Sequence, residues 1–364
     1  MGDRLAIDVQ EEIWPLKEVF RISRGSRTEA QVVVVTVGDK EHTGRGECVP
    51  IKRYGQSVQS VIAQIDSIKR ENNLDRQRLQ KLLPASAARN ALDCALWDLE
   101  SKISGKRVWE LVNIPMAHCS RRSVGDAHAS HPACNAVALR AGSEAATTNA
   151  GDLDQVETSF TISLDAPDKM VSAAKAAANS PLLKLKLGGD NLDLARVEAV
   201  REAAPYAGLL IDANESWSVE HYEEIIPALK KLRVALIEQP FPADADEVLE
   251  SLDHPIPICA DESCHTSADI PRLMNRYEAV NVKLDKTGGL TEALRLCENA
   301  RQSGFKLLIG CMVCTSLGIA PARVLASFAE WIDLDGPLLL ARDREHGLAY
   351  ENGRIGLPSQ QLWG

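Results

Sequence analysis

The sequence has no long hydrophobic run and no basic stripe, and both absences narrow what the protein can do. No apolar stretch approaches the roughly 18 residues of a membrane-spanning helix. The start, MGDRLAIDVQEEIWPL, carries charges where a secretory signal needs its apolar region. The 51 acidic residues outnumber the 41 basic ones, and the resulting net charge of −10 disfavours nucleic acid and membrane surfaces as partners. We expect a cytoplasmic protein that acts on a small molecule.

Two common motifs are also missing. Neither G-x-G-x-x-G nor a Walker sequence is present, so nothing indicates a nucleotide-binding open sheet. Nine cysteines, an odd and scattered number, suit free thiols better than a disulfide framework. Cys311 and Cys314 form the one C-x-x-C, and without a second pair we interpret that spacing as incidental.

The chain divides into regions with different patterns. Residues 1–116 contain the strand VVVVTVG and the amphipathic helix ARNALDCALWDLESKISG, which predict an α+β capping domain. Its loops at 24–27 and 53–55 are candidates for a lid. Residues 117–155 lack periodicity, and we interpret them as a loose insertion or linker. Its potential metal ligands match no standard zinc spacing: His118, Cys119, His128, His131 and Cys134.

Eight short apolar runs follow between 156 and 340: FTISL, LLKLKL, GLLIDA, VALIEQ, IPICAD, AVNVKL, KLLIGC and WIDLDG. Corresponding positions recur every 22 to 26 residues, the length of a strand, a loop, a three-turn helix and a return loop. The pattern predicts an α/β fold with a closed TIM-type barrel, since an open doubly wound sheet would need a switch point. Residues 341–364 are expected to return to the cap.

Three consecutive predicted strands end in carboxylates: Asp212 in LLIDANES, Glu238 in ALIEQPF and Asp261 in PICADES. The carboxyl ends of barrel strands form the face on which active sites are built, so the three should converge. Uncompensated, they would repel one another. Oxygen ligands without His or Cys select a hard cation, and Mg²⁺ is the first candidate.

Lysines are predicted on both sides of this metal. Lys184 and Lys186 lie two apart on one strand and therefore both face the barrel interior. Lys283 follows a strand nearly opposite, whereas Lys286 is interpreted as a supporting residue. Two amines flanking a metal-bound carboxylate could remove an α-proton from one face and return one to the other, which is the chemistry of a racemase or epimerase. Asp333 and Asp335 in WIDLDGP share one face and suit a substrate ammonium group.

With K-x-K, DANESW, EQPF, ADES, NVKLDKTGGL and D-L-D in this order, the chain resembles the enolase superfamily, in particular its muconate-lactonizing-enzyme-like branch. Within that branch it is similar to the L-Ala-D/L-Glu epimerases, which act on dipeptides derived from murein. The match runs from WPL and RGSR through ARNALDCALWDLE to DLDGP and omits only the 117–155 insertion. It implies a (β/α)7β-type modified TIM barrel beneath an N-terminal cap.

The resemblance also implies a role for each candidate residue. Mg²⁺ would be bound by Asp212, Glu238 and Asp261. Lys186 and Lys283 would exchange protons with the substrate, and Lys184 would neutralise its carboxylate. Asp333 and Asp335 would bind the dipeptide ammonium group. Arg24 would bind the glutamate side chain, with Arg27 as the alternative.

We therefore expect a Mg²⁺-dependent epimerase that inverts the glutamate α-carbon of L-Ala-D-Glu in murein peptide recycling, and a candidate homo-oligomer. The first rivals are an o-succinylbenzoate synthase and a cycloisomerase, whose substrates have no ammonium group for the paired aspartates. A dehydratase of the mandelate racemase type would need a His that LLIGCMVCTS lacks. A catalytically silent barrel that only binds ligands is the remaining alternative.

Overall fold

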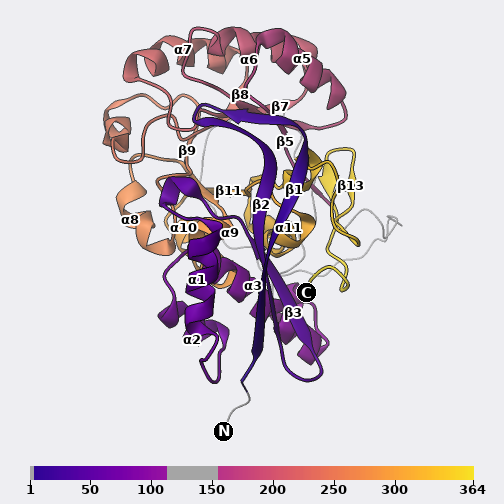
Figure 1. The fold of residues 1–364 in the computed structure, drawn as a ribbon. Coiled ribbons are helices and arrows are strands. Elements are labelled where there is room, and N and C mark those ends of the chain that lie inside the picture. Colours follow the sequence, from indigo (N-terminus) through magenta and orange to yellow (C-terminus); the bar gives the residue numbers. More distant parts are fainter. Residues whose placement is uncertain (1–3, 113–154) are drawn as a thin grey trace, which may run out of the picture.

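The computed structural model describes residues 4–112 and 155–364. The expected insertion lies outside these residues apart from its last position, together with its five histidines and cysteines. The β1–β2 hairpin of the cap reaches from the cap helices to the barrel strands (Figure 1). Among the described residues, no helix is long and apolar enough to cross a membrane.

The cap is built on a three-stranded antiparallel sheet in the order β1-β2-β3, formed by β1 (Ala6–Ile22), β2 (Gly25–Gly38) and β3 (Thr43–Cys48). Its helices are α1 (Val58–Ile68), α2 (Arg76–Leu82), α3 (Ala87–Ser104) and α4 (Val108–Leu111). The strand predicted from VVVVTVG lies within β2, and the helix predicted from ARNALDCALWDLESKISG is α3. Both predictions are confirmed.

The valine run of β2 is buried on both faces, which explains why it does not alternate with polar residues. Odd-numbered valines pack against the cap helices and even-numbered ones join the core shared with the barrel, namely Val33, Val35 and Val37 against Val32 and Val34. On β3, a Cβ at Gly46 would come within 2.1 Å of the carbonyl oxygen of Ala91. The glycine therefore permits the close packing of α3 on the sheet.

Eight parallel strands form the barrel in chain order: β5 (Phe160–Ile162), β6 (Leu182–Lys186), β7 (Gly208–Asp212), β8 (Val234–Glu238), β9 (Ile258–Ala260), β10 (Ala279–Val282), β11 (Lys306–Gly310) and β12 (Trp331–Asp333). The backbone N–H of Ser159 donates to the carbonyl of Ile332 at 2.8 Å and closes the ring. All eight predicted strands are present, and the α/β barrel is confirmed.

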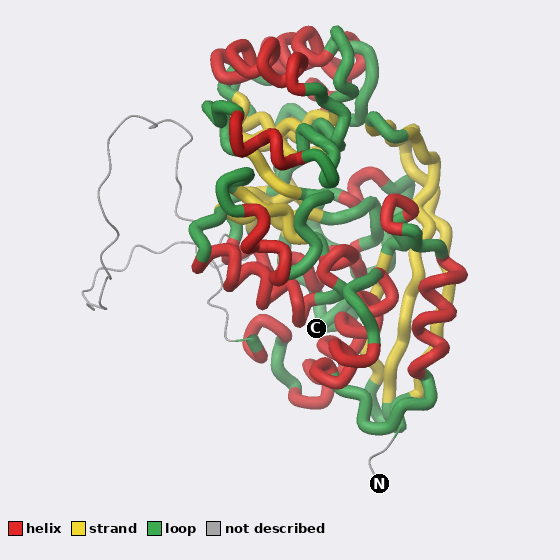
Figure 2. The backbone as a smooth tube through the Cα atoms, turned by 90° about the vertical axis from the view of Figure 1, so that its left-hand side faces the viewer, coloured by secondary structure: helices red, strands yellow, loops and turns green. Residues whose placement is uncertain are grey.

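Helices enclose the strands (Figure 2), the longer ones being α5 (Pro167–Ala176), α6 (Asp193–Ala203), α7 (Val219–Lys231), α10 (Leu290–Gln302) and α11 (Ser316–Arg323). The three-turn helix expected in every interval is wrong for two of them. Between β8 and β9 the chain forms the 3₁₀ helix η3 (Asp246–Ser251), and after β9 it forms only η4 (Ser267–Asp269) and α8 (Ile270–Leu273). Interval length does not explain the difference, because the 163–181 interval is as short as the 239–257 interval and still contains α5.

The remaining elements are short. Between β10 and α10 lies α9 (Leu284–Thr287), and η5 (Val324–Phe328) precedes β12. After β12 come η6 (Gly336–Leu339) and the hairpin of β13 (Tyr350–Glu351) and β14 (Arg354–Ile355), which pairs with β4 (Val156–Glu157). The domain limits inferred from the sequence stay predictions.

Alternate side chains fill the barrel interior in layers. The lower layer is apolar and consists of Leu210, Leu236, Cys259, Ala279 and Leu308. Two positions further along β7 and β8, at their carboxyl ends, stand Asp212 and Glu238. Since side chains two apart in a strand share a face, the charged groups point into the same interior as the apolar layer. The apolar layer thus closes the barrel beneath them.

Candidate active site

The predicted carboxylates meet at the carboxyl ends of β7, β8 and β9. Asp212 and Glu238 are the last residues of their strands and pair in register, and Asp261 directly follows β9. One oxygen from each lies within 4.8 Å of the other two, and all three side chains are buried. Three oxygen donors without nitrogen or sulfur fit a hard divalent cation.

The lysines surround these carboxylates from opposite sides. Lys186 Nζ lies 2.5 Å from Asp212 Oδ2, and Lys283 Nζ lies 2.6 Å from Asp261 Oδ2. Their strands, β6 and β10, are four places apart in the ring of eight, so the two ammonium groups approach from opposite walls. Both side chains remain slightly exposed, 9% and 7%, toward the barrel mouth.

Lys184 occupies a different position, one layer deeper on β6. Its side chain is only 1% exposed, and its Nζ lies 2.7 Å from both Glu238 Oε2 and Asp333 Oδ2 and 3.2 Å from Asp212 Oδ2. Enclosed by three carboxylates, it can compensate their charge but cannot reach the mouth. The structure thus separates the three lysines into one buried counter-charge and two facing amines.

Neighbouring charges decide the pKa of each group. Burial would raise the pKa of Asp212, but Lys186 and Lys184 outweigh it and hold the pKa below its usual range. Burial and the charge of Asp212 raise the pKa of Glu238. Burial lowers the pKa of Lys283, yet Asp261 and Glu238 outweigh it and the net pKa is raised. Asp212 and the neighbouring lysines therefore stabilise one another as ions, whereas the ionised form of Glu238 is disfavoured.

The two aspartates after Trp331 lie on the same side of the barrel mouth. Asp333 accepts hydrogen bonds from Lys184 at 2.7 Å and from the Ser159 hydroxyl at 2.5 Å. Burial would raise the pKa of Asp333, but the charge of Lys184 outweighs burial and lowers it. Asp335 accepts from the backbone N–H of Thr161 at 2.6 Å. Burial and the charge of Asp333 raise the pKa of Asp335 to about 7.

Two further residues support the candidate metal ligands: Lys286, which was expected to do so, and Asn281, which the sequence did not single out. Lys286 donates to Asp261 Oδ1 at 2.6 Å and to the Asn281 carbonyl at 2.9 Å. The Asn281 amide donates to Glu238 Oε1 at 2.7 Å. A Cβ at Gly310 would lie 2.5 Å from Asn281 Oδ1, so only glycine leaves room for this contact. Asn281 is two residues before Lys283, and strand periodicity could have identified it.

The cap loops contribute arginines above the barrel. Arg24 donates to the Asn214 carbonyl at 2.7 Å and forms ion pairs with Glu215 at 3.0 Å and Glu262 at 2.6 Å. Its guanidinium is therefore already engaged by three barrel groups. Arg27 is exposed, and in the described part of the chain no hydrogen bond or ion pair engages its side chain.

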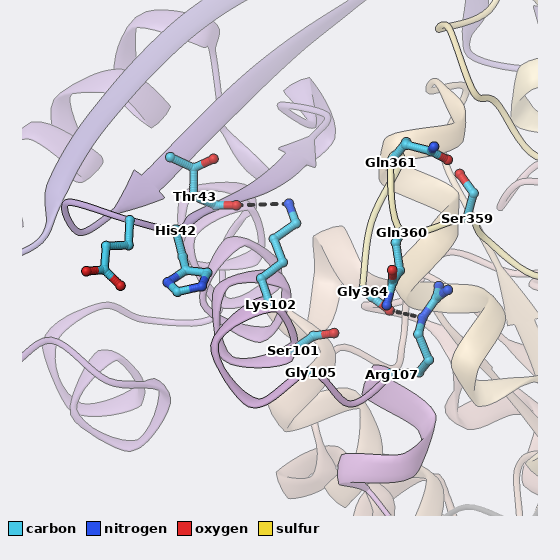
Figure 3. Close-up of a pocket in the computed structure, with 11 residues that line it drawn as sticks. His42, Thr43, Ser101, Lys102, Gly105, Arg107, Ser359, Gln360, Gln361 and Gly364 are labelled. Carbon is cyan, nitrogen blue, oxygen red and sulfur yellow. Dashed lines mark hydrogen bonds between the residues drawn. The ribbon is translucent and has the colours of Figure 1, made fainter.

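A surface pocket of about 830 Å³ lies elsewhere, between the β2–β3 turn, the end of α3 and the C-terminal residues (Figure 3). Lys102 donates to the Thr43 carbonyl and Arg107 to that of Gly364, as the dashed lines in Figure 3 show. Its cations are thus already paired with backbone groups. None of the residues that line it belongs to the predicted site.

Two family models cover almost the whole described chain. Residues 4–113 match the mandelate racemase/muconate lactonizing enzyme N-terminal domain, and residues 169–361 match the enolase C-terminal domain-like family. The chain therefore belongs to the mandelate racemase and muconate lactonizing enzyme group of the enolase superfamily, and the resemblance inferred from its motifs is confirmed.

Individual relatives narrow the class to the epimerases. The chain is 43% identical to the L-Ala-D/L-Glu epimerase of Escherichia coli (strain K12), over 96% of this chain and 99% of that one. It is 41% identical to an N-acetyl-D-glutamate racemase of Pseudoalteromonas sp, over 92% and 95% of the two chains. An enolase family member from Agrobacterium tumefaciens with homology to dipeptide epimerases, solved with sodium and L-Ala-L-Glu, has a TM-score of 0.86 at 42% identity, covering 99% and 100%. The chain is an enzyme of the isomerase class, an epimerase.

Proposed function

We propose that this enzyme is a Mg²⁺-dependent dipeptide epimerase that inverts the glutamate α-carbon of L-Ala-D-Glu and L-Ala-L-Glu. The observation that carries the proposal is the placement of Lys186 and Lys283 on opposite walls of the barrel, with three buried carboxylates between them. A single base could serve a lyase, but an epimerase needs a proton donor on each face of the substrate.

Asp212, Glu238 and Asp261 would bind Mg²⁺, and the bound ion would stabilise the negative charge that develops on the substrate carboxylate. In each direction, the lysine that is in its neutral amine form, Lys186 or Lys283, accepts the α-proton at Nζ, and the ammonium group of the other donates a proton to the opposite face. Lys184 stays charged, because the carboxylates that surround it favour the ammonium form and raise its pKa against burial.

The substrate's two ends would be bound outside the metal site. Asp333 and Asp335 suit the ammonium group of the alanine residue because both are carboxylates beside the barrel mouth. For the glutamate side chain, we propose Arg27 in place of Arg24. Arg24 already forms ion pairs with Glu215 and Glu262 and donates to a carbonyl. Within the described residues, the side chain of Arg27 forms no hydrogen bond or ion pair.

A second candidate substrate is N-acetylglutamate. L-Ala-Glu and N-acetylglutamate are both N-acylated glutamates, and one relative at 41% identity is named as a racemase of the acetyl compound. The two substrates differ at the end that Asp333 and Asp335 would meet, since only the dipeptide has an ammonium group. The paired aspartates favour the dipeptide. A cytoplasmic role in murein peptide recycling and a homo-oligomeric state stay predictions.

The test is to incubate the protein with Mg²⁺ in D₂O and follow the glutamate α-proton by NMR. L-Ala-D-Glu and N-acetyl-D-glutamate are compared in parallel, with EDTA as the control. We expect metal-dependent loss of the α-proton signal and growth of the L-Ala-L-Glu population, faster than any racemisation of the acetyl compound. Faster reaction of N-acetylglutamate would favour the second candidate. No exchange with either would favour a lyase, a cycloisomerase or a binding protein.

A further inference from the structure

Glu215 lies in the loop after β7 and contacts two separate loops of the cap. Its carboxylate accepts from Arg24 Nη1 at 3.0 Å, from Arg53 Nε at 3.0 Å and Nη2 at 2.9 Å, and from the backbone N–H of Ala243 at 3.0 Å. The carboxylate side chain is 6% exposed, whereas the arginines are 34% and 45% exposed. A barrel carboxylate is therefore the shared acceptor for both cap loops.

The backbone at this position is held in an uncommon conformation. Asn214 and Glu215 have φ angles of 47° and 66°, in the left-handed region that non-glycine residues rarely adopt. The Glu215 N–H donates to the Gln239 carbonyl at 2.9 Å, which ties this turn to the end of β8. Strained residues of this kind persist where the surroundings determine them, and they cluster at binding sites.

The residue after Arg53 also contacts the barrel. Tyr54 packs edge-on against His265, with ring centroids 4.4 Å apart. His265 follows the candidate ligand Asp261 by four residues, so this contact joins the 51–56 loop to the barrel loop after β9. Within residues 4–112 and 155–364, Glu215 is the one acceptor for the Arg53 side chain. The 51–56 loop thus contacts the barrel through the Arg53–Glu215 pair and the neighbouring Tyr54–His265 packing.

We propose that Glu215 is a positioning residue that holds the cap loops at 22–27 and 51–56 over the barrel mouth, and so determines how tightly the substrate side chain is bound. The identity of the substrate in this inference rests on the proposed function, whereas the loop contacts of Glu215 do not depend on it. Glu215 touches neither the metal ligands nor the proton-transfer lysines in the described structure. Its loss should therefore weaken binding and leave the chemical step nearly intact.

The two loops should respond unequally. The 22–27 loop keeps other contacts, because Arg24 still pairs with Glu262 and Ser23 donates to the Asn214 carbonyl at 3.2 Å. For the Arg53 side chain, the described structure gives no acceptor other than Glu215. Removing the Glu215 charge is therefore expected to loosen residues 51–56 more than residues 22–27.

The experiment compares Glu215→Gln with Glu223→Gln, an exposed glutamate on α7, in the Mg²⁺-loaded full-length protein. Hydrogen–deuterium exchange by mass spectrometry is expected to be about threefold faster at 51–56 and less changed at 22–27. KM for L-Ala-L-Glu should rise about tenfold while kcat changes less than about threefold. Combining Glu215→Gln with Arg53→Lys should raise KM little beyond the larger single effect, because the two residues act as one contact.

Each outcome decides between alternatives. Unchanged exchange at both loops, or faster exchange with KM equal to that of Glu223→Gln, would overturn the proposal. A fall in kcat alone would also overturn it, since Glu215 would then act on the chemical step. If the unmodified enzyme epimerises neither N-acylated glutamate, the proposed function fails. The exchange measurement then still decides whether Glu215 holds the loops.

Discussion

Two of the regions that bury carboxylates differ in the groups that donate hydrogen bonds to them. At the barrel mouth, Asp212, Asp261 and Asp333 each lie within 2.5 to 2.7 Å of a lysine ammonium group. At the boundary between cap and barrel, Asp93 and Asp285 are as deeply buried but accept from amide groups. Asp285 Oδ1 accepts from the Val49 N–H at 2.9 Å and the Asn90 side chain at 2.8 Å, and Asp93 accepts from the Thr291 N–H at 2.8 Å.

The pKa values follow this difference. Against the effect of burial, lysines lower the pKa of Asp212, Asp261 and Asp333. At the boundary, burial raises the pKa of Asp93 to about 6 and that of Asp285 to about 7. Asp212, Asp261 and Asp333 thus keep their negative charge, which the proposed metal binding would require. At the boundary, Asp93 and Asp285 accept hydrogen bonds that join cap and barrel, and burying their negative charge destabilises the folded state.

The strongest test of this contrast removes the cations of the barrel mouth. Lys186→Ala and Lys283→Ala should each lower epimerisation by about 10³-fold or more, because one face of the substrate then lacks its acid or base. Each variant should still exchange the α-proton of one epimer with D₂O, which NMR detects. Lys175→Ala, an exposed lysine on α5, is the matched control. Full activity in either active-site variant would contradict the two-lysine mechanism.

The next test exchanges carboxylate for amide in both regions. Glu238→Gln removes one metal ligand and should reduce kcat/KM by about 10²-fold or more, together with Mg²⁺ affinity measured by calorimetry. Asp285→Asn keeps an oxygen acceptor for both of its donors and should retain near-normal activity. If both variants lost activity and Mg²⁺ affinity equally, the two regions would not differ in the way described.

A smaller effect is expected from the raised pKa of Asp335. Its ionised form suits a substrate ammonium group, so lowering the pH through about 7 should raise KM for L-Ala-L-Glu as the carboxylate is protonated. Asp335→Asn should raise that KM about tenfold at pH 8 and leave N-acetylglutamate, which has no ammonium group, unaffected. Steady-state kinetics at pH 6 and 8 provide the measurement. Equal changes for both substrates would show that Asp335 does not bind the ammonium group.

Much of the barrel and its interior could be predicted because both depend on short-range periodicity. A spacing of 22 to 26 residues identified the strands, and the period of two placed Lys184 and Lys186 on the inner face. Asp212, Glu238 and Asp261 could be grouped because parallel strands end at one rim. The same spacing wrongly predicted long helices around β9, because a repeat of strands does not determine which structure fills the interval between them.

Contacts between distant segments could not be predicted. Glu215 lies in a left-handed turn without periodicity, and its arginine partners lie more than 160 residues earlier in the chain. The engagement of Arg24 by Glu215 and Glu262 depends on how the cap meets the barrel, which no local pattern encodes. For the same reason, the sequence could not choose between Arg24 and Arg27 as the side-chain receptor.

The smallest effect is a pH dependence of stability at the boundary. The pKa of Asp285 is about 7 in the folded protein and about 4 for an ordinary unfolded carboxyl, so the folded state holds this proton over a wider pH range. Its contribution to stability is therefore greatest near pH 4 and is lost as the pH rises toward 7. Asp285→Asn removes this loss while keeping an acceptor for both donors, and should increase the free energy of unfolding at pH 8 by about 1–3 kcal/mol. Urea unfolding should show little difference between variant and parent at pH 4, a difference that grows between pH 4 and 7, and a constant one above pH 7. A difference that does not vary with pH would mean that geometry, not charge, governs this carboxylate.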